Sequence, residues 1–218
     1  MGISASDPHG EAALYAAGAS LDEAAGAIIA IHGRGADAAD IINLAGEVAP
    51  PGVVILAPNA AGQTWYPYRF IEPIERNEPY LTSALSLIDR IFARLAEADI
   101  PPNRVALLGF SQGACLALEY AARNAQRYGA VIGFSGGLIG PMGAMFDYSG
   151  SMDGTPVFLG CSDVDAHIPV RRVEETADVM TRLGAAVDLR IYPGMGHTVN
   201  QDEVQSVRTM LTALGSDS

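Results

Sequence analysis

The chain has 218 residues, enough for one compact domain, and its 49% apolar and 17% charged residues predict a large buried core rather than disorder. Its formal charge of −12 disfavours nucleic acid and anionic lipid surfaces as partners. All 13 basic residues are arginine, which excludes the Schiff-base, pyridoxal-phosphate and phosphate-loop chemistries that need lysine.

Short apolar runs rich in β-formers alternate with longer helical patterns. In chain order the predicted strands are 27–32, 53–58, 105–110, 130–135, 156–161 and 187–192. The predicted helices are 37–49, 80–98, 111–124, 170–184 and 200–214. Strands that are apolar throughout are covered on both faces, so this alternation predicts a doubly wound, mostly parallel α/β sheet. The segment around 12–17 could add an antiparallel edge strand.

No internal repeat or linker divides the chain, so we expect a single domain over residues 1–218 in which residues 1–10 form a loose N-terminus. Cys115 and Cys161 lie in apolar runs, which indicates two buried thiols rather than a disulfide framework. The first residues lack the pattern of a secretory signal, and no apolar run reaches the ~18 residues that span a bilayer. We therefore expect a cytoplasmic protein without stable membrane insertion.

Two long segments, 59–79 and 136–155, do not fit the alternation of strands and helices. Both are rich in aromatic residues or methionine, and loops this long in a compact domain are usually functional or disordered. We interpret both as walls of a substrate pocket; the alternative is that they cover a subunit interface or a sheet edge. The candidate substrate-binding residues within them are Trp65, Tyr66, Phe70 and Met142.

Residues 109–113 read GFSQG and match the G-x-S-x-G turn that carries a nucleophilic serine between a strand and a helix. Residues 133–137, GFSGG, also match, so the pattern by itself is not decisive. Ser111 follows a predicted strand and leads into a strong helical run. Ser135 is followed by glycines and Pro141, which will not begin a regular helix. We therefore assign Ser111 as the nucleophile.

The base and its orienting acid should follow the serine in the order Ser, Asp, His. His197 follows the last predicted strand in a glycine-rich turn, PGMGH, and is the candidate base. Asp163 and Asp165 both follow the strand 156–161. We favour Asp165, which lies on the turn before the next helix, whereas Asp163 could cap that turn.

The other three histidines receive no catalytic role. His9 falls in the N-terminal segment that we expect to be loose, His32 ends the first core strand and is expected to be structural, and His167 is expected at the rim of the site.

Residues 32–35, HGRG, directly follow the first core strand, where glycines let backbone N–H groups approach a carbonyl oxygen. We predict that the backbone N–H groups of Arg34 and Gln112 form the oxyanion hole.

Four motifs now stand in order: HGRG, GFSQGA, DAHIP after a strand, and GMGH. Together they resemble the phospholipase/carboxylesterase family of small α/β-hydrolases, over roughly residues 27–214. The resemblance implies an α/β-hydrolase fold without a large cap domain, acting on carboxylic esters or thioesters. It carries the triad over to Ser111, Asp165 and His197 and the oxyanion amides to Arg34 and Gln112. The family commonly has an apolar residue where this chain has Arg34, and Asp-Pro where it reads Asp165-Ala166.

These observations predict a serine carboxylesterase whose Ser-His-Asp mechanism needs no metal and no organic cofactor. The two cysteines and four histidines are too scattered to form a zinc site. The expected partner is a small ester, and a homodimer is left open. The runner-up is an acyl-protein thioesterase or lysophospholipase. A small serine peptidase, or a non-catalytic binding protein on the same fold, comes third.

Overall fold

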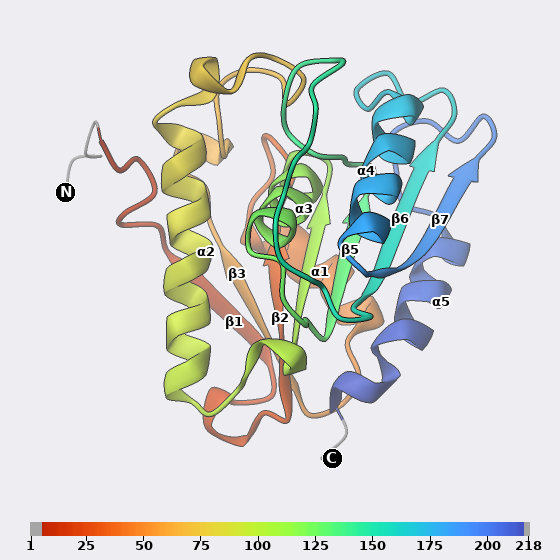
Figure 1. Ribbon diagram of the computed structural model, residues 1–218. Helices are drawn as coiled ribbons and strands as arrows, with labels where there is room; N and C mark the ends of the chain where they lie inside the picture. Colours follow the sequence, from red (N-terminus) through yellow and green to blue (C-terminus); the bar gives the residue numbers. More distant parts are fainter. Residues whose placement is uncertain (1–5, 216–218) are drawn as a thin grey trace.

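The computed structural model describes residues 6–215, which form one seven-stranded sheet with helices on both faces (Figure 1). The strand order is β1-β3-β2-β4-β5-β6-β7, and only the β1–β3 pair is antiparallel. The strands are β1 (Leu14–Gly18), β2 (Gly26–Ile31), β3 (Val53–Pro58), β4 (Val105–Phe110), β5 (Ala130–Phe134), β6 (Pro156–Ser162) and β7 (Ala186–Tyr192). The predicted edge strand is therefore present; it begins two residues and ends one residue later than the segment 12–17 that suggested it.

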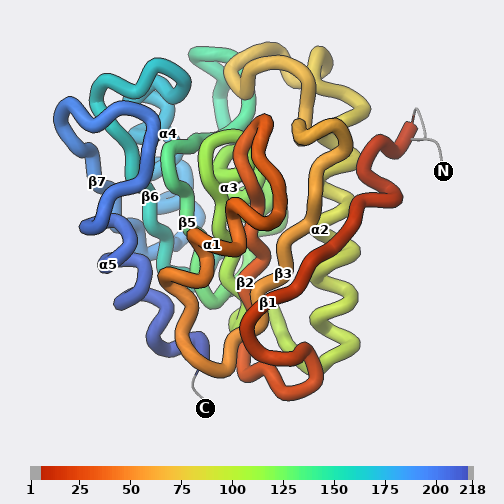
Figure 2. Tube along the Cα trace, turned by 180° about the vertical axis from the view of Figure 1, so that it is seen from behind, coloured from red at the N-terminus to blue at the C-terminus, as the bar shows by residue number. Residues whose placement is uncertain are grey.

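Residues 6–215 contain five α-helices, four of them between strands and the last after β7: α1 (Ala38–Val48), α2 (Tyr80–Glu97), α3 (Gln112–Arg123), α4 (Val170–Arg182) and α5 (Gln201–Met210). Helices α2, α3 and α4 cover one face of the sheet, and α1 and α5 cover the other (Figures 1 and 2). Helices α1 and α5 begin at capping boxes, in which Asp37 and Asn200 accept hydrogen bonds from the first helical N–H groups.

The apolar strands are buried on both sides, which explains why their sequences do not alternate. All six residues of β2 are buried; Ile29 and Ile31 face the core beneath α2 and α3, whereas Ile28 and Ala30 face the core beneath α1 and α5. Helix α3 is buried from Gln112 to Ala122, since it lies between the sheet and the long loops. The centre of the molecule is therefore the β4–α3 unit.

The carboxyl ends of β2, β4, β6 and β7, which precede the candidate site residues, lie at one edge of the sheet. Ile31 at the end of β2 pairs with Gly109 of β4, so the loops that follow these two strands are neighbours. The segments after β6 and β7 reach the same edge, since those strands are parallel to β4 and β5. Parallel sheets place their ligand crevices at this carboxyl edge.

The N-terminal segment is more ordered than the sequence suggested, and the expectation of a loose stretch over 1–10 is wrong where the structure describes it. His9 is fully buried; its Nε2 donates to the carbonyl of Trp65 at 3.0 Å, and its Nδ1 accepts from the N–H of Ala61 at 3.1 Å. Residues 1–5 lie outside the described residues. Across 6–215, no helix has the length and apolar character that crossing a membrane requires.

Candidate active site

Ser111 lies at the sharp turn between β4 and α3. Its backbone has φ 55° and ψ −119°, in the left-handed half of conformational space that side chains avoid. A Cβ at Gly109 would collide with the backbone of Gly113, and a Cβ at Gly113 would collide with the carbonyl of Ile31. The two glycines are thus required for β4, α3 and β2 to pack closely enough to present the serine.

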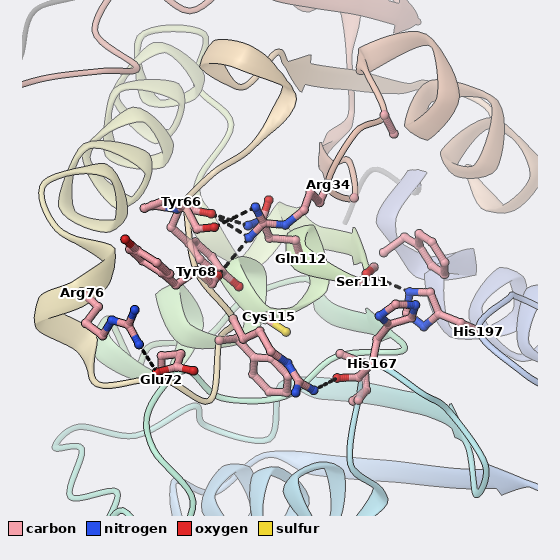
Figure 3. A pocket seen from close by; sticks show the side chains of 17 residues that line it. Arg34, Tyr66, Tyr68, Glu72, Arg76, Ser111, Gln112, Cys115, His167 and His197 are labelled. Atoms are coloured by element: carbon pink, nitrogen blue, oxygen red, sulfur yellow. Dashed lines mark hydrogen bonds and ion pairs between the residues drawn. The ribbon is translucent and has the colours of Figure 1, made fainter.

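Ser111, His197 and Asp165 form one chain of hydrogen bonds. The hydroxyl Oγ of Ser111 lies 2.8 Å from Nε2 of His197, and Nδ1 of His197 lies 2.7 Å from Oδ2 of Asp165 (Figure 3). The imidazole is held between two rings, with centroid distances of 5.0 Å to Phe110 and 4.8 Å to His167. The three residues therefore have the spacing of a nucleophile, a base and an orienting acid.

The Asp165 side chain is fully buried and accepts several hydrogen bonds. Oδ1 accepts from the N–H groups of His167 at 2.8 Å and Ile168 at 3.0 Å, and Oδ2 faces His197. Burial by itself would raise the pKa of Asp165, but the hydrogen bonds from His197 and the two N–H groups outweigh it and hold that pKa below its usual value. The carboxyl is therefore an anion at neutral pH.

Asp163, the competing aspartate, holds the histidine loop instead. Its Oδ1 accepts from the N–H of Gly194 at 2.7 Å. Gly194 and Gly196 have φ of 67° and 64°, a backbone conformation that favours glycine and lets the short loop after β7 turn His197 back over the sheet. Asp163 therefore positions His197 through the backbone of the loop after β7. The sequence had suggested that Asp163 caps the turn after β6 instead.

The loop after β2 lies directly beside the nucleophile. A Cβ built on Gly33 would come within 3.4 Å of the Ser111 Cβ. Within residues 6–215, the backbone N–H groups of Arg34 and Gln112 have no acceptor in the protein, and Gln112 is the first residue of α3. Two free N–H donors therefore border the serine, one of them at a helix N-terminus.

The side chains of Arg34 and Gln112 hydrogen-bond to the backbone of the loop 59–79, a role that the sequence analysis did not predict. The Arg34 guanidinium donates to the carbonyls of Tyr66 at 2.8 Å, Pro67 at 3.0 Å and Tyr68 at 2.9 Å (Figure 3). Gln112 donates to the Tyr66 carbonyl at 2.8 Å and accepts from the Trp65 N–H at 2.9 Å. Hydrogen bonds from an arginine or glutamine side chain to backbone carbonyls have no fixed sequence spacing, so the sequence held no specific signal for this role.

A pocket of about 570 Å³ opens over Ser111. The loop 59–79 contributes the largest share of its lining, including the predicted residues Tyr66 and Phe70. His167, which we expected at the rim, also lines the pocket and is exposed. The other lining residues are Gly33, Arg34, Ala36, Pro67, Tyr68, Arg69, Glu72, Arg76, Phe110, Ser111, Gln112, Cys115, Ile168 and His197.

Trp65 and Met142 are not among the lining residues, which corrects their assignment to the substrate pocket. Trp65 is 1% exposed, donates from Nε1 to the carbonyl of His32 at 2.8 Å and packs against the rings of His9 and His32. Because its indole N–H donates to a buried backbone carbonyl, Trp65 anchors the loop 59–79 to the core. Met142 is half exposed, with its sulfur 3.6 Å from the Arg172 guanidinium.

The segment 136–155 contributes no lining residue to the pocket, contrary to the prediction that it forms a pocket wall, and contacts the loop 59–79 instead. The Gly140 N–H donates to the carbonyl of Phe70 at 2.8 Å, and the two loops lie side by side above the sheet (Figures 1 and 2). Two buried charged residues hold the segment: Arg172 donates to the carbonyls of Leu138 and Gly140, and Glu119 accepts from the Ile139 N–H.

Four further polar groups of interest lie in or near the core. Ser135 is fully buried and does not line the pocket, so it is unsuited to meet a substrate. Cys115 and Cys161 are buried free thiols, as expected, and burial raises the pKa of each to about 12. The Tyr66 hydroxyl is buried beside the Cys115 thiol. No three His, Cys, Asp or Glu side chains within 6–215 are gathered to hold a metal ion.

The chain is similar to known esterases in both sequence and fold. Residues 16–214 match the family model described as Phospholipase/Carboxylesterase. A solved phospholipase/carboxylesterase from Dyadobacter fermentans is 41% identical, with a TM-score of 0.88 over 91% of this chain and 95% of that one. A solved structure of esterase PE8 is 26% identical, with a TM-score of 0.76 over 93% and 99% of the two chains. The seven-stranded sheet is therefore an α/β-hydrolase fold, and a large cap domain is absent from the described residues.

Among curated proteins, acyl-protein thioesterase 1 of Gibberella zeae is 28% identical over 147 residues. The match covers 65% of this chain and 62% of that relative, so the chain spans about three fifths of the relative's length.

Proposed function

The chain belongs to the phospholipase/carboxylesterase family, and on that premise we propose that it is a serine carboxylesterase that cleaves small esters through an acyl-serine at Ser111. The observation that carries the proposal is the unbroken chain of hydrogen bonds from Ser111 Oγ through His197 to Asp165, with 2.8 and 2.7 Å between the heavy atoms. An apolar pocket above the serine and two free N–H groups beside it supply the remaining needs of acyl transfer.

In the proposed cycle, Ser111 Oγ attacks the ester carbonyl carbon while Nε2 of His197 takes the hydroxyl proton. Asp165 keeps the other ring nitrogen protonated and stabilises the imidazolium. The N–H groups of Arg34 and Gln112 bind the oxyanion. His197 then gives its proton to the departing alkoxide, which leaves as alcohol, and a water molecule repeats the attack to release the carboxylic acid and regenerate Ser111.

A thioester is the second candidate substrate, supported by the name of the Gibberella zeae relative, acyl-protein thioesterase 1. The same groups would act on it, since the leaving thiolate needs less help from the acid than an alkoxide does. An assay of oxygen esters and thioesters that share one acyl chain separates the two candidates.

The proposal is tested by labelling with a fluorophosphonate, which reacts only with an activated serine, and by ester hydrolysis. We expect Ser111→Ala to abolish labelling and to lower kcat by about 10⁶-fold, as loss of a triad serine does elsewhere. Ser135→Ala serves as the matched control and should keep both. Labelling that persists in the folded Ser111→Ala protein would refute the assignment.

A further inference from the structure

The charged residues of the pocket lining carry an excess of positive charge, although the protein as a whole is strongly acidic. Three arginines, Arg34, Arg69 and Arg76, line the pocket, and Glu72 is its one formally charged acid. The chain as a whole has a formal charge of −12. The excess of guanidinium groups is therefore a local property of the site and not a reflection of composition.

Two of the three arginines are already committed to the protein. Arg34 donates three hydrogen bonds to the carbonyls of the loop 59–79. Arg76 pairs with Glu72 at 2.7 Å, and its guanidinium lies 4.2 Å from the centroid of the Tyr68 ring. Arg34 thus holds the pocket wall, and Glu72 neutralises the charge of Arg76.

Arg69 makes the weakest contacts with the protein of the three pocket arginines. It is exposed, and its single hydrogen bond in the described structure runs to the carbonyl of His167 at 3.3 Å. Within residues 6–215 no carboxylate lies within ion-pair distance of it. A guanidinium has five N–H donors arranged in a fork that fits a carboxylate or a phosphate, so most of this capacity is unused.

Arg69 is also close to the reacting groups. The residue to which it bonds, His167, contacts the ring of His197 with a centroid distance of 4.8 Å, and His197 in turn lies 2.8 Å from the Ser111 hydroxyl. Figure 3 shows the rings of His167 and His197 side by side, next to Ser111. Arg69 and Ser111 also line the same pocket, so an anion held by Arg69 would belong to a molecule whose ester group enters the pocket over the serine.

We propose that the site takes esters that bear an anionic group, a carboxylate or a phosphate, and that Arg69 binds this group at the mouth of the pocket. The inference rests on the proposed esterase function and names its substrate class. The negative charge of the whole protein does not oppose it, because surface charges farther away than about 10 Å are largely screened at 0.1 M salt.

The test compares matched esters. 4-Acetoxybenzoate carries a carboxylate, 4-acetoxyphenyl phosphate carries a phosphate, and methyl 4-acetoxybenzoate is neutral. Mono-4-nitrophenyl glutarate and its methyl ester place the charge on the acyl side instead. Because these esters differ in intrinsic reactivity, kcat/KM for each is compared between protein variants. The two anionic acetates distinguish a carboxylate from a phosphate as the preferred group.

We expect Arg69→Gln to lower kcat/KM for at least one anionic ester by about tenfold, the order expected for one charge-assisted hydrogen bond. The neutral counterpart should change by less than about twofold, and Arg69→Lys should restore part of the loss. Arg94→Gln is the control, since it makes the same change of net charge on an exposed residue near the end of α2, away from the pocket.

Equal factors for anionic and neutral esters in Arg69→Gln, or no change for any ester, would overturn the inference while leaving the esterase proposal intact. Failure of the unmodified protein to hydrolyse any ester and to take the fluorophosphonate at Ser111 would overturn both.

Discussion

At the scale of single residues, two aspartates two positions apart have separate tasks. Asp165 hydrogen-bonds the ring of His197, and Asp163 hydrogen-bonds the backbone of the loop that carries it. We expect Asp165→Asn to lower kcat by roughly 10⁴-fold, because an amide at this position favours the wrong histidine tautomer. Asp163→Asn keeps an acceptor for the Gly194 N–H and should lower kcat by less than about tenfold.

Steady-state kinetics of the two variants, with circular dichroism to establish that both are folded, measures this difference. A larger loss of kcat in Asp163→Asn than in Asp165→Asn would require the two roles to be exchanged.

Trp65 shows how a single side chain can fix a loop without touching substrate. It is buried between two histidines and donates to a backbone carbonyl, so truncation leaves both a cavity and an unpaired acceptor. We expect Trp65→Ala to lower the free energy of unfolding by about 3–5 kcal/mol and to reduce kcat/KM for all esters alike. Urea denaturation and an ester panel of graded chain length measure the two effects. If kcat/KM fell only for long or bulky esters and the free energy of unfolding stayed normal, Trp65 would have to be assigned to the pocket lining.

At the scale of elements, the pocket wall 59–79 depends on contacts from outside the loop. The Arg34 guanidinium satisfies three of its carbonyls, and the Gln112 side chain donates to the Tyr66 carbonyl at 2.8 Å and accepts from the Trp65 N–H at 2.9 Å. We expect Arg34→Met to weaken hydrogen-exchange protection of residues 64–70 and to lower kcat/KM about tenfold for neutral as well as anionic esters, since a mobile wall positions every substrate poorly.

Because Arg34→Met leaves the backbone N–H in place, fluorophosphonate labelling of Ser111 should persist. Unchanged exchange in 64–70 beside a normal kcat/KM would show that the loop holds its shape without Arg34.

The elements themselves were largely predictable, because their signals are local. The strand β3 has the bounds that its apolar run indicated, and each of the five predicted helices is present, with α5 ending earlier than predicted, at Met210. The strand order was not predictable, since the apolar strands have interchangeable surfaces. The pairing of Ile31 with Gly109, which brings the loop carrying Arg34 beside Ser111, depends on how the whole sheet assembles.

The roles within the site divide in the same way. The strand-turn-helix context singled out Ser111, and the glycine-rich turn singled out His197. The pocket walls could not be assigned, because aromatic content is equally suited to lining a pocket and to anchoring a loop. Whether Trp65 or Tyr68 faced the cavity depended on distant partners such as His9 and His32, which no spacing in the sequence links to the loop.

At the scale of the whole molecule, buried titratable groups on opposite sides of the sheet make stability depend on pH in opposite directions. Burial lowers the pKa of His9 and of His32, which hold the loop 59–79. Below the ordinary histidine pKa of 6.5 the unfolded chain therefore binds protons that the folded protein refuses, and these two groups destabilise the fold as the pH falls.

Glu203 acts in the reverse sense from α5. It is fully buried; one carboxyl oxygen accepts from the Asn200 N–H at 2.8 Å, and the other has no hydrogen-bond partner in the described structure and abuts Gly160 of β6. Burial raises its pKa from 4.5 to about 7. Between these values the folded protein holds a proton that the unfolded chain has lost, so the stability Glu203 contributes below pH 4.5 disappears as the pH rises through 7.

We therefore expect the free energy of unfolding of the unmodified protein to fall, relative to that of Glu203→Gln, by about 2–3 kcal/mol between pH 4.5 and 8, at about 1.4 kcal/mol per pKa unit. The amide cannot ionise but keeps an oxygen for the Asn200 N–H, so the variant retains the helix cap. Urea denaturation at intervals of one pH unit gives both curves, and their difference cancels the contributions of His9 and His32. Glu174→Gln, an exposed position on α4, is the matched control and should show no such divergence. Parallel curves for Glu203→Gln and the unmodified protein would mean that Glu203 ionises in the fold as readily as in the unfolded chain, and that the buried carboxyl finds in solution a partner for its second oxygen.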